Sequence, residues 1–257
     1  MPSADEAPQR GNGPHPLFAL IPAHNEAKTI REVVEQTLPH VEGVIVVDDG
    51  SSDGTAEAVA STAATLIQRS VNGGKGAALL DGMANAFGEA KAAAVITLDA
   101  DRQHDPASIQ AFREAASRAP GALILGDRSA GFRGMALNRA WGIAFGNFFI
   151  GWASKQRVRD AQCGMRLYPR AVWEKARVPE KHSQGFLFET AILIYAADSG
   201  TRFATVPIEA RREGYVLRPS HFHPIWDFIR IFALVTRLLA ARGFRPRGLL
   251  IALGLLR

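Results

Sequence analysis

Short apolar runs alternate along the chain with amphipathic segments of helical length. The runs at residues 17–21, 44–47 and 95–98 are made almost entirely of apolar side chains, which is typical of buried strands. Weaker runs at residues 65–68 and 122–125 predict further strands. The alternation predicts an α/β fold, with a mostly parallel sheet and helices on both faces. Helical patterns fill the stretches near residues 30–38, 53–64, 75–87 and 105–119, the last opened by Asp105 as N-cap and Pro106 as first helical residue.

Polar residues follow three of these runs directly, where each predicted strand ends. Residues 22–26 (PAHNE) come after the first run, residues 48–55 (DDGSSDGT) after the second, and residues 99–104 (DADRQH) after the run at 95–98. Because ligands of a parallel sheet bind at the carboxyl ends of its strands, we expect these residues to open onto one edge. Helix caps would use one aspartate each, and Glu26 would suit a helix N-terminus as well as a ligand.

Asp99 and Asp101 are the sharpest candidates for a metal site. Residues i and i+2 of an extended segment point the same way, and the amide of Gln103 offers a third oxygen ligand. Such hard oxygen ligands suit Mg²⁺ or Mn²⁺ that keeps open positions for phosphate oxygens. The glycine-rich turn at residues 73–76 (GGKG) predicts a flexible loop near the site, with Lys75 approaching a phosphate.

The composition narrows the class of protein. The chain has 257 residues, 47% apolar and 21% charged, which fits one sizeable core and excludes wholesale disorder. One cysteine, Cys163, excludes a disulfide scaffold and a cysteine-rich zinc module. Residues 1–16 hold four prolines and two glycines with almost nothing apolar, which predicts a disordered leader before a domain at residues 17–224.

The positive charge is concentrated in one segment. The formal net charge is +5, and residues 225–257 carry six arginines against Asp227 alone, so residues 1–224 are formally neutral. A neutral body lacks the basic groove that tracks nucleic-acid phosphates, so we exclude nucleic acid as a partner. No apolar segment near the start resembles a secretory signal, and none is long enough to span a bilayer.

The sequence allows two locations, the protein core or a membrane surface, for each of two apolar segments. Residues 225–241 predict an amphipathic helix with Asp227, Arg230 and Arg237 on one face. This helix would either pack on the core or lie in a membrane interface, its arginines meeting anionic headgroups. Residues 138–152 combine five aromatic side chains with three glycines, as either a core helix or a lipid-facing segment that receives an acceptor chain.

A set of ordered motifs carries a family resemblance. The motifs are IPAHNE (21–26), VVDDGSSDGT (46–55), NGGKGAAL (72–79), TLDADRQHDP (97–106), DAQCGMRLYPR (160–170) and GFLFET (185–190). With them the chain resembles the family 2 glycosyltransferases with the GT-A fold, and the resemblance continues to about residue 224. Within that family it is most similar to the dolichol- or polyprenyl-phosphate sugar transferases, a likeness carried by the string DADRQH at residues 99–104.

The resemblance implies a role for each matching position. His24 and Ala191 depart from the pattern, since relatives often have Tyr and a second Glu there. On the donor side the implied contacts are Pro22, His24, Glu26, Val47 and Asp49 for the base and ribose, Asp99, Ala100, Asp101 and Gln103 for the diphosphate and metal, and Arg128 for a donor phosphate. On the acceptor side they are Asp160, Arg166 and Glu189, with Arg211, Arg212 and Arg218 in the region that places basic residues on the phosphates.

These roles predict a metal-dependent, inverting glycosyltransferase. The ion held by Asp101 and its neighbours, together with Arg128, would neutralise the charge that builds on the departing diphosphate. A lipid phosphate acceptor is already ionised and needs little base, whereas a hydroxyl acceptor needs one, for which Asp160 is the candidate. Asp160 would otherwise orient Arg166 through an ion pair, and Glu189 would otherwise be structural.

We therefore expect an enzyme that sits peripherally on the cytoplasmic face of the cell membrane. It would move a sugar from a UDP- or GDP-linked donor to a lipid carrier, with polyprenyl phosphate as the first choice. The same donor chemistry with a hydroxyl acceptor on another lipid or glycan is the second hypothesis. An inactive module that only binds sugar nucleotides is the third.

Overall fold

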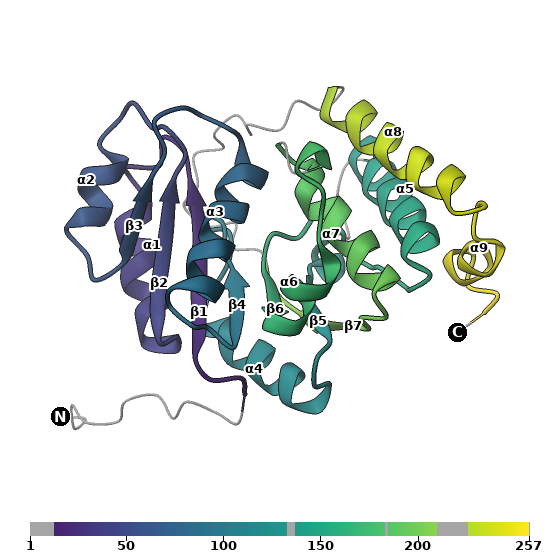
Figure 1. Cartoon of the computed structure of the whole chain (residues 1–257), viewed down its shortest axis with the longest axis horizontal. Coiled ribbons are helices and arrows are strands. Elements are labelled where there is room, and N and C mark those ends of the chain that lie inside the picture. The colour runs from purple at the N-terminus through teal and green to yellow at the C-terminus, as the bar shows by residue number, and fades with distance from the viewer. Residues whose placement is uncertain (1–12, 133–136, 183–184, 210–225, 257) are drawn as a thin grey trace.

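The fold is a seven-stranded mixed sheet between two layers of helices (Figure 1). The structure, a computed structural model, describes residues 13–132, 137–182, 185–209 and 226–256. Its strands are β1 (Leu17–Ala23), β2 (Gly43–Asp48), β3 (Thr65–Gln68), β4 (Ala94–Thr97), β5 (Leu123–Asp127), β6 (Arg166–Pro169) and β7 (Phe203–Pro207). Its helices are α1 (Ile30–Thr37), α2 (Thr55–Ala60), α3 (Lys75–Gly88), α4 (Ile109–Arg118), α5 (Leu137–Ser154), α6 (Arg170–Ala176), α7 (Leu187–Asp198), α8 (Trp226–Ala241) and α9 (Pro246–Ala252).

The strand order is β3-β2-β1-β4-β6-β5-β7. Strands β1 to β4 pair in parallel with their neighbours in that group, and β5 pairs in parallel with β7. Strand β6 runs antiparallel to both β4 and β5. The predicted mostly parallel sheet is confirmed. Strands β6 and β7 were not foreseen, because Arg166 and Thr205 place polar side chains in their short segments.

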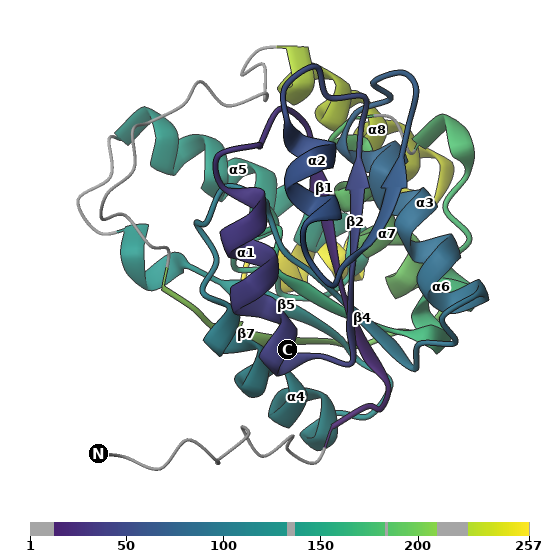
Figure 2. The ribbon, with the colours of Figure 1, turned by 90° about the vertical axis from the view of Figure 1, so that its left-hand side faces the viewer.

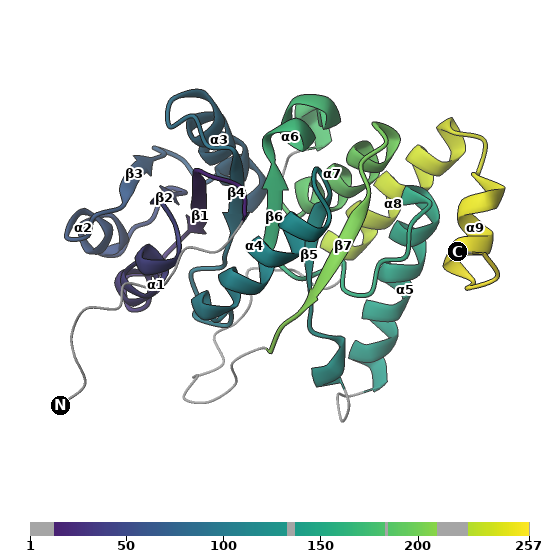
Figure 3. The same cartoon turned by 90° about the horizontal axis from the view of Figure 1, so that it is seen from below.

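Two apolar cores lie on opposite faces of the sheet, because the central strands are apolar on both faces. Leu20 and Val95 point into the core that also holds side chains of α3, α6, α7 and α8. Ile21 and Ile96 point into the other, with side chains of α1, α2 and α4. Figure 2 shows α1 and α3 on either side of β1 and β2, and Figure 3 shows the two helical layers from below. The predicted helices on both faces are confirmed.

Two aspartates that follow apolar runs cap helices. Asp105 accepts a hydrogen bond from the N–H of Ala107 at 3.0 Å, as its position before Pro106 predicted. Asp53 precedes Gly54, the N-cap of α2, and accepts from the N–H of Thr55, the first residue of this helix, at 3.0 Å. Helix α2 ends earlier than expected, at Ala60. Capping therefore accounts for these two carboxylates and leaves the others at the strand ends to be explained.

The C-terminal helices answer one question that the sequence left open. Leu234, Val235, Leu238 and Leu239 of α8 are buried in the same core as α3 and α7, so α8 packs on the domain. Its other face remains exposed, however, and so does part of α5. The core and interface hypotheses for these helices are therefore not exclusive. No helix in the described ranges is both long enough and apolar enough to cross a membrane.

A glycine in α3 sets how closely this helix approaches the sheet. A Cβ at Gly82 would collide with Cδ1 of Leu20 and come within 3.0 Å of Cγ2 of Val47. We expect Gly82→Ala to lower the free energy of unfolding by about 1–3 kcal/mol, as overpacked core positions do. The matched control is Gly88→Ala in the same helix, where a Cβ meets nothing within 4 Å and better helix propensity should give no loss. Equal denaturation midpoints for the two variants would contradict this packing.

Candidate functional site

The sheet brings the sequence-predicted residues to one edge. The carboxyl ends of β1, β2, β4 and β5 lie there because these strands run in the same direction. Strand β6 runs the other way, so the residues before its first residue, Arg166, arrive at the same edge. The edge therefore gathers His24, Asp49, Asp99, Arg128 and Asp160 from five separate segments.

Asp49 at the end of β2 holds the glycine-rich turn. Its Oδ1 accepts from the N–H of Gly73 at 2.9 Å and its Oδ2 from the N–H of Gly74 at 2.7 Å. Gly74 has a φ of +82°, and a Cβ there would stand 3.0 Å from Cα of Gly185. Only glycine fits this conformation and this close approach without strain. The turn is thus fixed between β2 and the start of the α7 segment, and the next residue, Lys75, begins α3.

Lys75 bridges two carboxylates at the centre of the site. Its Nζ lies 2.7 Å from Oδ1 of Asp99 and 3.1 Å from Oε1 of Glu189, which stands in the first turn of α7. Burial alone would lower the pKa of Lys75, but the two carboxylates raise it above its usual range. Burial would likewise raise the pKa of Asp99, yet Lys75 and His104 hold it well below its usual range. Lys75 is therefore a fixed cation that joins β4, α3 and α7.

A missing side chain at Gly164 makes room for Asp99. A Cβ at Gly164 would stand 2.5 Å from Oδ2 and 2.7 Å from Oδ1 of Asp99. The carbonyl of Gly164 accepts from the hydroxyl of Thr97 at 2.6 Å, which fixes the segment before β6 against β4. On the other side, the N–H of Asp99 donates to Nδ1 of the buried His104 at 3.1 Å.

Asp101 has the opposite electrostatic environment. Burial, together with the Asp99 carboxylate and the more weakly acting Glu26, raises its pKa to about 6. Gln103 donates both its N–H, at 3.0 Å to Oδ1, and its side-chain amide, at 2.6 Å to Oδ2. Among the residues that the structure describes, Asp101 has no ion pair to a lysine or arginine. Negative charge is therefore in excess at this position.

This excess fits the binding of a cation. Asp99, Asp101 and the amide oxygen of Gln103 supply the hard oxygen atoms that Mg²⁺ and Mn²⁺ prefer. In the described ranges no cluster of three or more His, Cys, Asp or Glu side chains is arranged to hold a metal by itself. A divalent ion at Asp101 would thus need further oxygen ligands from a bound molecule, as a diphosphate provides.

Arg128 and Asp160 form a closed pair at the end of β5. Nε of Arg128 lies 2.7 Å from Oδ2 of Asp160, and Nη2 lies 3.1 Å from Oδ1. The main-chain N–H of Arg128 also donates to Oδ2 at 3.2 Å, and the Asp160 side chain is fully buried. Asp160 was expected either to act as a base or to orient Arg166. The structure instead assigns its carboxylate to Arg128.

Comparison with known proteins identifies the family. Residues 18–176 match the family described as Glycosyl transferase family 2, which is more than half of the chain. This chain belongs to glycosyltransferase family 2.

Several curated relatives of this glycosyltransferase are named as transferases that act on lipid phosphates. A dolichyl-phosphate beta-glucosyltransferase of Trichomonas vaginalis is 29% identical over 74% of this chain and 62% of its own length. A UDP-N-acetylglucosamine–dolichyl-phosphate N-acetylglucosaminyltransferase of Methanococcus voltae is 26% identical over 75% and 84%. An undecaprenyl-phosphate 4-deoxy-4-formamido-L-arabinose transferase of Pseudomonas fluorescens is 27% identical over 91% and 70%. The chain spans less than two thirds of the Trichomonas protein.

Solved structures share the fold. Glucosyl-3-phosphoglycerate synthase of Mycobacterium tuberculosis, crystallised with Mn²⁺, UDP and phosphoglyceric acid, superposes with a TM-score of 0.66. It is 21% identical to this chain, and the match covers 88% of this chain and 78% of the synthase. The same synthase has also been crystallised with Mg²⁺ and UDP. The likeness supports the GT-A architecture of the glycosyltransferase.

Several expected donor contacts lie at the site edge of this glycosyltransferase with different exposures. Pro22 at the end of β1 and His24 after it are half-buried, and Nδ1 of His24 is 2.9 Å from the carbonyl oxygen of Asp49. The N–H of Glu26 donates to the hydroxyl of Thr55, and its carboxylate accepts from Thr29. The side chains of Val47 and Ala100 are buried in the core, so they offer a ligand only their main chains.

Arg166, an expected acceptor-side residue, points into the protein. Its side chain is almost fully buried and donates to three carbonyl oxygens, those of Cys163 at 2.9 Å, Ala161 at 2.7 Å and Glu189 at 2.7 Å. Arg166 therefore holds the segment that carries Asp160 and Gly164 against the start of α7. Arg211, Arg212 and Arg218, the other basic acceptor-side candidates, lie outside the described residues.

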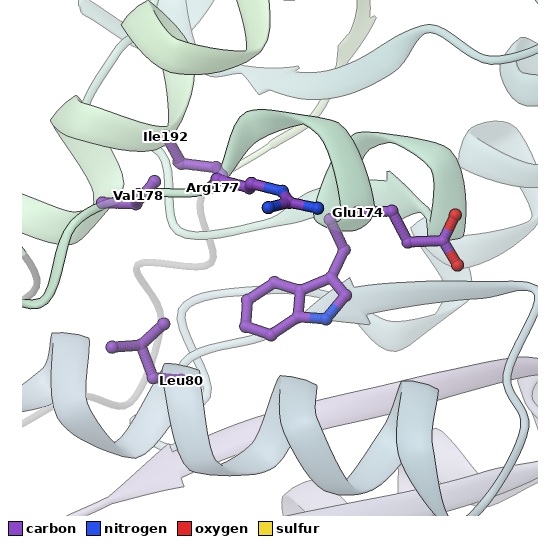
Figure 4. A pocket seen from close by; sticks show the side chains of 6 residues that line it. Leu80, Glu174, Arg177, Val178 and Ile192 are labelled. Atoms are coloured by element: carbon purple, nitrogen blue, oxygen red, sulfur yellow. The ribbon is translucent and has the colours of Figure 1, made fainter.

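The structure also has a pocket that lies away from the polar residues at the strand ends. A pocket of about 310 Å³ lies between α3, α6 and α7, lined by Leu80, Trp173, Glu174, Arg177, Val178 and Ile192 (Figure 4). Its lining contains none of the strand-end residues. We therefore place the functional site at the sheet edge, on the polar groups described above.

Two residues of the site escaped sequence reasoning. Arg69, just after β3, lies 2.8 Å from Oδ1 of Asp49 and also pairs with Asp81. Gly164 leaves the space that Asp99 occupies. The motif DAQCGMRLYPR contains Gly164 but gives no sign of this role, since the contact joins positions 65 residues apart. The arrangement of both depends on the folded strand order.

Filling the space at Gly164 should displace Asp99. We expect Gly164→Ala to lower glycosyl transfer by about ten- to a hundredfold, because a shift of about 1 Å in a reacting group costs that much. Thermal stabilisation by a nucleoside diphosphate with Mn²⁺ should fall in parallel. Gly142→Ala, where a Cβ meets nothing within 4 Å, is the matched control and should keep both. A fully active Gly164→Ala enzyme would show that the position of Asp99 is not needed.

Asp101 should reduce the stability of the metal-free protein. The pKa of Asp101 is raised to about 6 in the folded state. Ionising this carboxyl therefore costs more in the folded protein than in the unfolded chain, so the protein is more stable below about pH 4 and loses this stability as the pH rises through about 6. We expect Asp101→Asn to raise the free energy of unfolding at pH 7 by about 1–2 kcal/mol in the presence of chelator. The gain should vanish below about pH 4, and glycosyl transfer should be abolished.

The control for Asp101→Asn is Glu114→Gln, which also removes one carboxylate but at a half-exposed position on α4. Urea denaturation at several pH values measures both variants. A loss of stability at pH 7 for Asp101→Asn would contradict the excess of negative charge at the site.

Proposed function

We propose that this glycosyltransferase moves a sugar, with inversion, from a nucleoside-diphosphate sugar to a polyprenyl phosphate, using Mg²⁺ or Mn²⁺. The observation that carries the donor half is the excess of carboxylate charge at Asp101, beside the ordered glycine turn. The acceptor half is supported by the names of the relatives, which act on dolichyl or undecaprenyl phosphate.

The proposed binding site of the donor diphosphate is formed by residues at the ends of β4 and β5 and by Lys75. Asp99, Asp101 and Gln103 would hold the divalent ion, which when bound supplies positive charge to the diphosphate as it leaves. Lys75 and Arg128 lie near the same carboxylates and add fixed positive charge at the edge, since both act on Asp99. His24, Glu26 and the main chain of Val47 are the proposed contacts of the nucleoside. Asp49 acts through the turn that it holds.

The buried, hydrogen-bonded carboxylate of Asp160 favours a phosphate acceptor over a hydroxyl acceptor. A general base must have a lone pair free to accept a proton. Each carboxylate oxygen of Asp160 accepts two hydrogen bonds, Oδ2 from Nε and the N–H of Arg128 and Oδ1 from Nη2 of Arg128 and the N–H of Gln162, and the side chain is buried. A phosphate oxygen is already anionic at neutral pH and attacks without a base, so the closed pair is no obstacle to it. Arg211, Arg212 and Arg218 remain predicted contacts of the acceptor phosphate.

We further propose that the enzyme works peripherally at the cytoplasmic face of the membrane. Nucleotide sugars are water-soluble, whereas a polyprenyl phosphate stays in the bilayer, so the site must reach both phases. The exposed apolar side chains of α5 and α8 support contact with lipid.

The test is transfer from UDP- and GDP-linked sugars to polyprenyl phosphate in detergent, with product anomers assigned by NMR. We expect inversion, loss of transfer in excess chelator, and recovery with Mn²⁺ or Mg²⁺. The rate should be nearly flat between about pH 7 and pH 9, because no side-chain base is needed. Binding of donor without transfer to any acceptor would indicate an inactive module and contradict the proposal.

Asp160→Asn separates the two acceptor classes. With a phosphate acceptor we expect a partial loss, from the broken pair with Arg128, and an unchanged pH profile. A hydroxyl acceptor would give a near-complete loss and a rate in wild type that rises with pH. Glu42→Gln is the control, since it breaks a similar pair, with Arg113, at the opposite edge of the sheet.

A further inference from the structure

The exposed apolar side chains of the molecule gather in one region. In the described part of the chain, every large hydrophobic side chain that is exposed, except Val71, belongs to α5, α8, α9 or the turns beside α9. Trp141 is 74% exposed, Trp226 64%, Leu253 54% and Ile229 48%. Single exposed apolar residues are common on proteins, but a concentration of this kind marks an interaction surface. We call it the α5–α8–α9 surface.

These helices form one packed unit. The rings of Phe145 on α5 and Phe228 on α8 are 5.6 Å apart, and those of Phe149 and Phe232 are 5.3 Å apart. Nε1 of Trp152 donates to the carbonyl of Phe244 at 2.6 Å, which fixes the turn before α9. Figure 1 shows the three helices together at the end of the molecule opposite α2. The surface is therefore a fixed part of the fold.

Exposed basic side chains accompany the apolar ones. Lys155, Arg157, Arg237 and Arg247 are exposed on or beside these helices. Residues 226–256 contain one acidic residue, Asp227. Like charges on both partners would oppose pairing of this surface with a second copy of the chain. Tryptophan and leucine mixed with arginine instead match the boundary between headgroups and acyl chains of an anionic bilayer.

The surface is also coupled to the candidate site. Asn147 lies on α5, and its Nδ2 donates to the carbonyl of Arg159 at 2.5 Å. Its Oδ1 accepts from the N–H of Ala161 at 2.8 Å. The two bonds enclose Asp160, the partner of Arg128. Helix α5 is thus hydrogen-bonded to both neighbours of Asp160, and a ligand that binds α5 contacts the helix that holds this segment of the site.

We propose that the α5–α8–α9 surface docks this glycosyltransferase on an anionic phospholipid bilayer, with Trp141 and Trp226 in the interface and Arg237 and Arg247 at the headgroups. The link between this surface and the lipid acceptor rests on the proposed function. Docking by this face presents the edge with Arg128 and Asp160 to a phosphate that stays in the headgroup layer.

Vesicle binding tests the surface. The full chain is mixed with vesicles of phosphatidylcholine alone or with phosphatidylglycerol, and the bound fraction is measured by flotation. We expect binding to the anionic vesicles that weakens with salt. The double variant Trp141→Glu, Trp226→Glu should reduce the partition coefficient at least about tenfold. Arg237→Gln with Arg247→Gln should reduce it by about fivefold for each arginine and leave the fold intact.

The control is Val71→Glu, which places one glutamate at a 72% exposed apolar position outside the surface and is compared with Trp141→Glu alone. It should bind vesicles as wild type does. Equal binding of the tryptophan variant and wild type, or no binding of wild type, would overturn the docking inference. Dimers in wild type that dissociate in the tryptophan variant, without vesicle binding, would identify a self-association surface and overturn it as well.

A transfer assay keeps this inference distinct from the proposed function. The tryptophan variant should lose transfer to a long polyprenyl phosphate in vesicles but keep transfer to a short, water-soluble polyprenyl phosphate. If wild type transfers to neither acceptor, the proposed function fails, and flotation still decides the docking surface. If the variant loses transfer to both, the surface acts on the site directly and docking is not its role.

Discussion

A half-buried lysine balances the charge on which the site depends. Lys75 sits between Asp99 from β4 and Glu189 from α7, and it is itself the first residue of α3. Without it, Asp99, Asp101 and Glu189 would repel one another across a partly dry edge of the sheet. With it, Asp99 stays ionised, because Lys75 lowers the pKa of this carboxylate. Two carboxylates, Asp99 and Glu189, share Lys75 as their ion-pair partner, and the third, Asp101, favours a cation.

The antiparallel strand β6 gives the site its second half. Because β6 enters the sheet from the edge at which β4 and β5 end, the preceding residues lie beside Asp99 and Arg128. Arg166 at its start gathers three carbonyls, and Gly164 leaves space for Asp99. The same segment is held from behind by Asn147 of α5, which connects the polar edge to the apolar helices. The polar strand ends and the apolar helices are thus joined through this one segment.

The family match covers part of the candidate site, and helices beyond the match complete it. The family match covers residues 18–176, which includes β1 to β6 and the polar groups at their ends. The helices α7, α8 and α9 lie beyond it, yet Glu189 of α7 takes part in the charge balance at the site. The family match covers the strand ends that form the candidate site, whereas the C-terminal helices carry most of the exposed apolar side chains of the proposed lipid contact.

The sequence by itself determined the α/β class, the first five strands to within about two residues, and the motifs that lie at the strand ends. These features follow from local patterns, since burial on both faces of a strand requires an apolar run and an amphipathic helix repeats its apolar positions every three to four residues. Tertiary structure alone decided which carboxylate pairs with which cation. Lys75 meets Asp99 and Glu189, Asp160 meets Arg128 instead of Arg166, and Arg166 turns inward. Such pairings join residues 23 to 114 positions apart, and their energies depend on distance and burial, which no local pattern encodes.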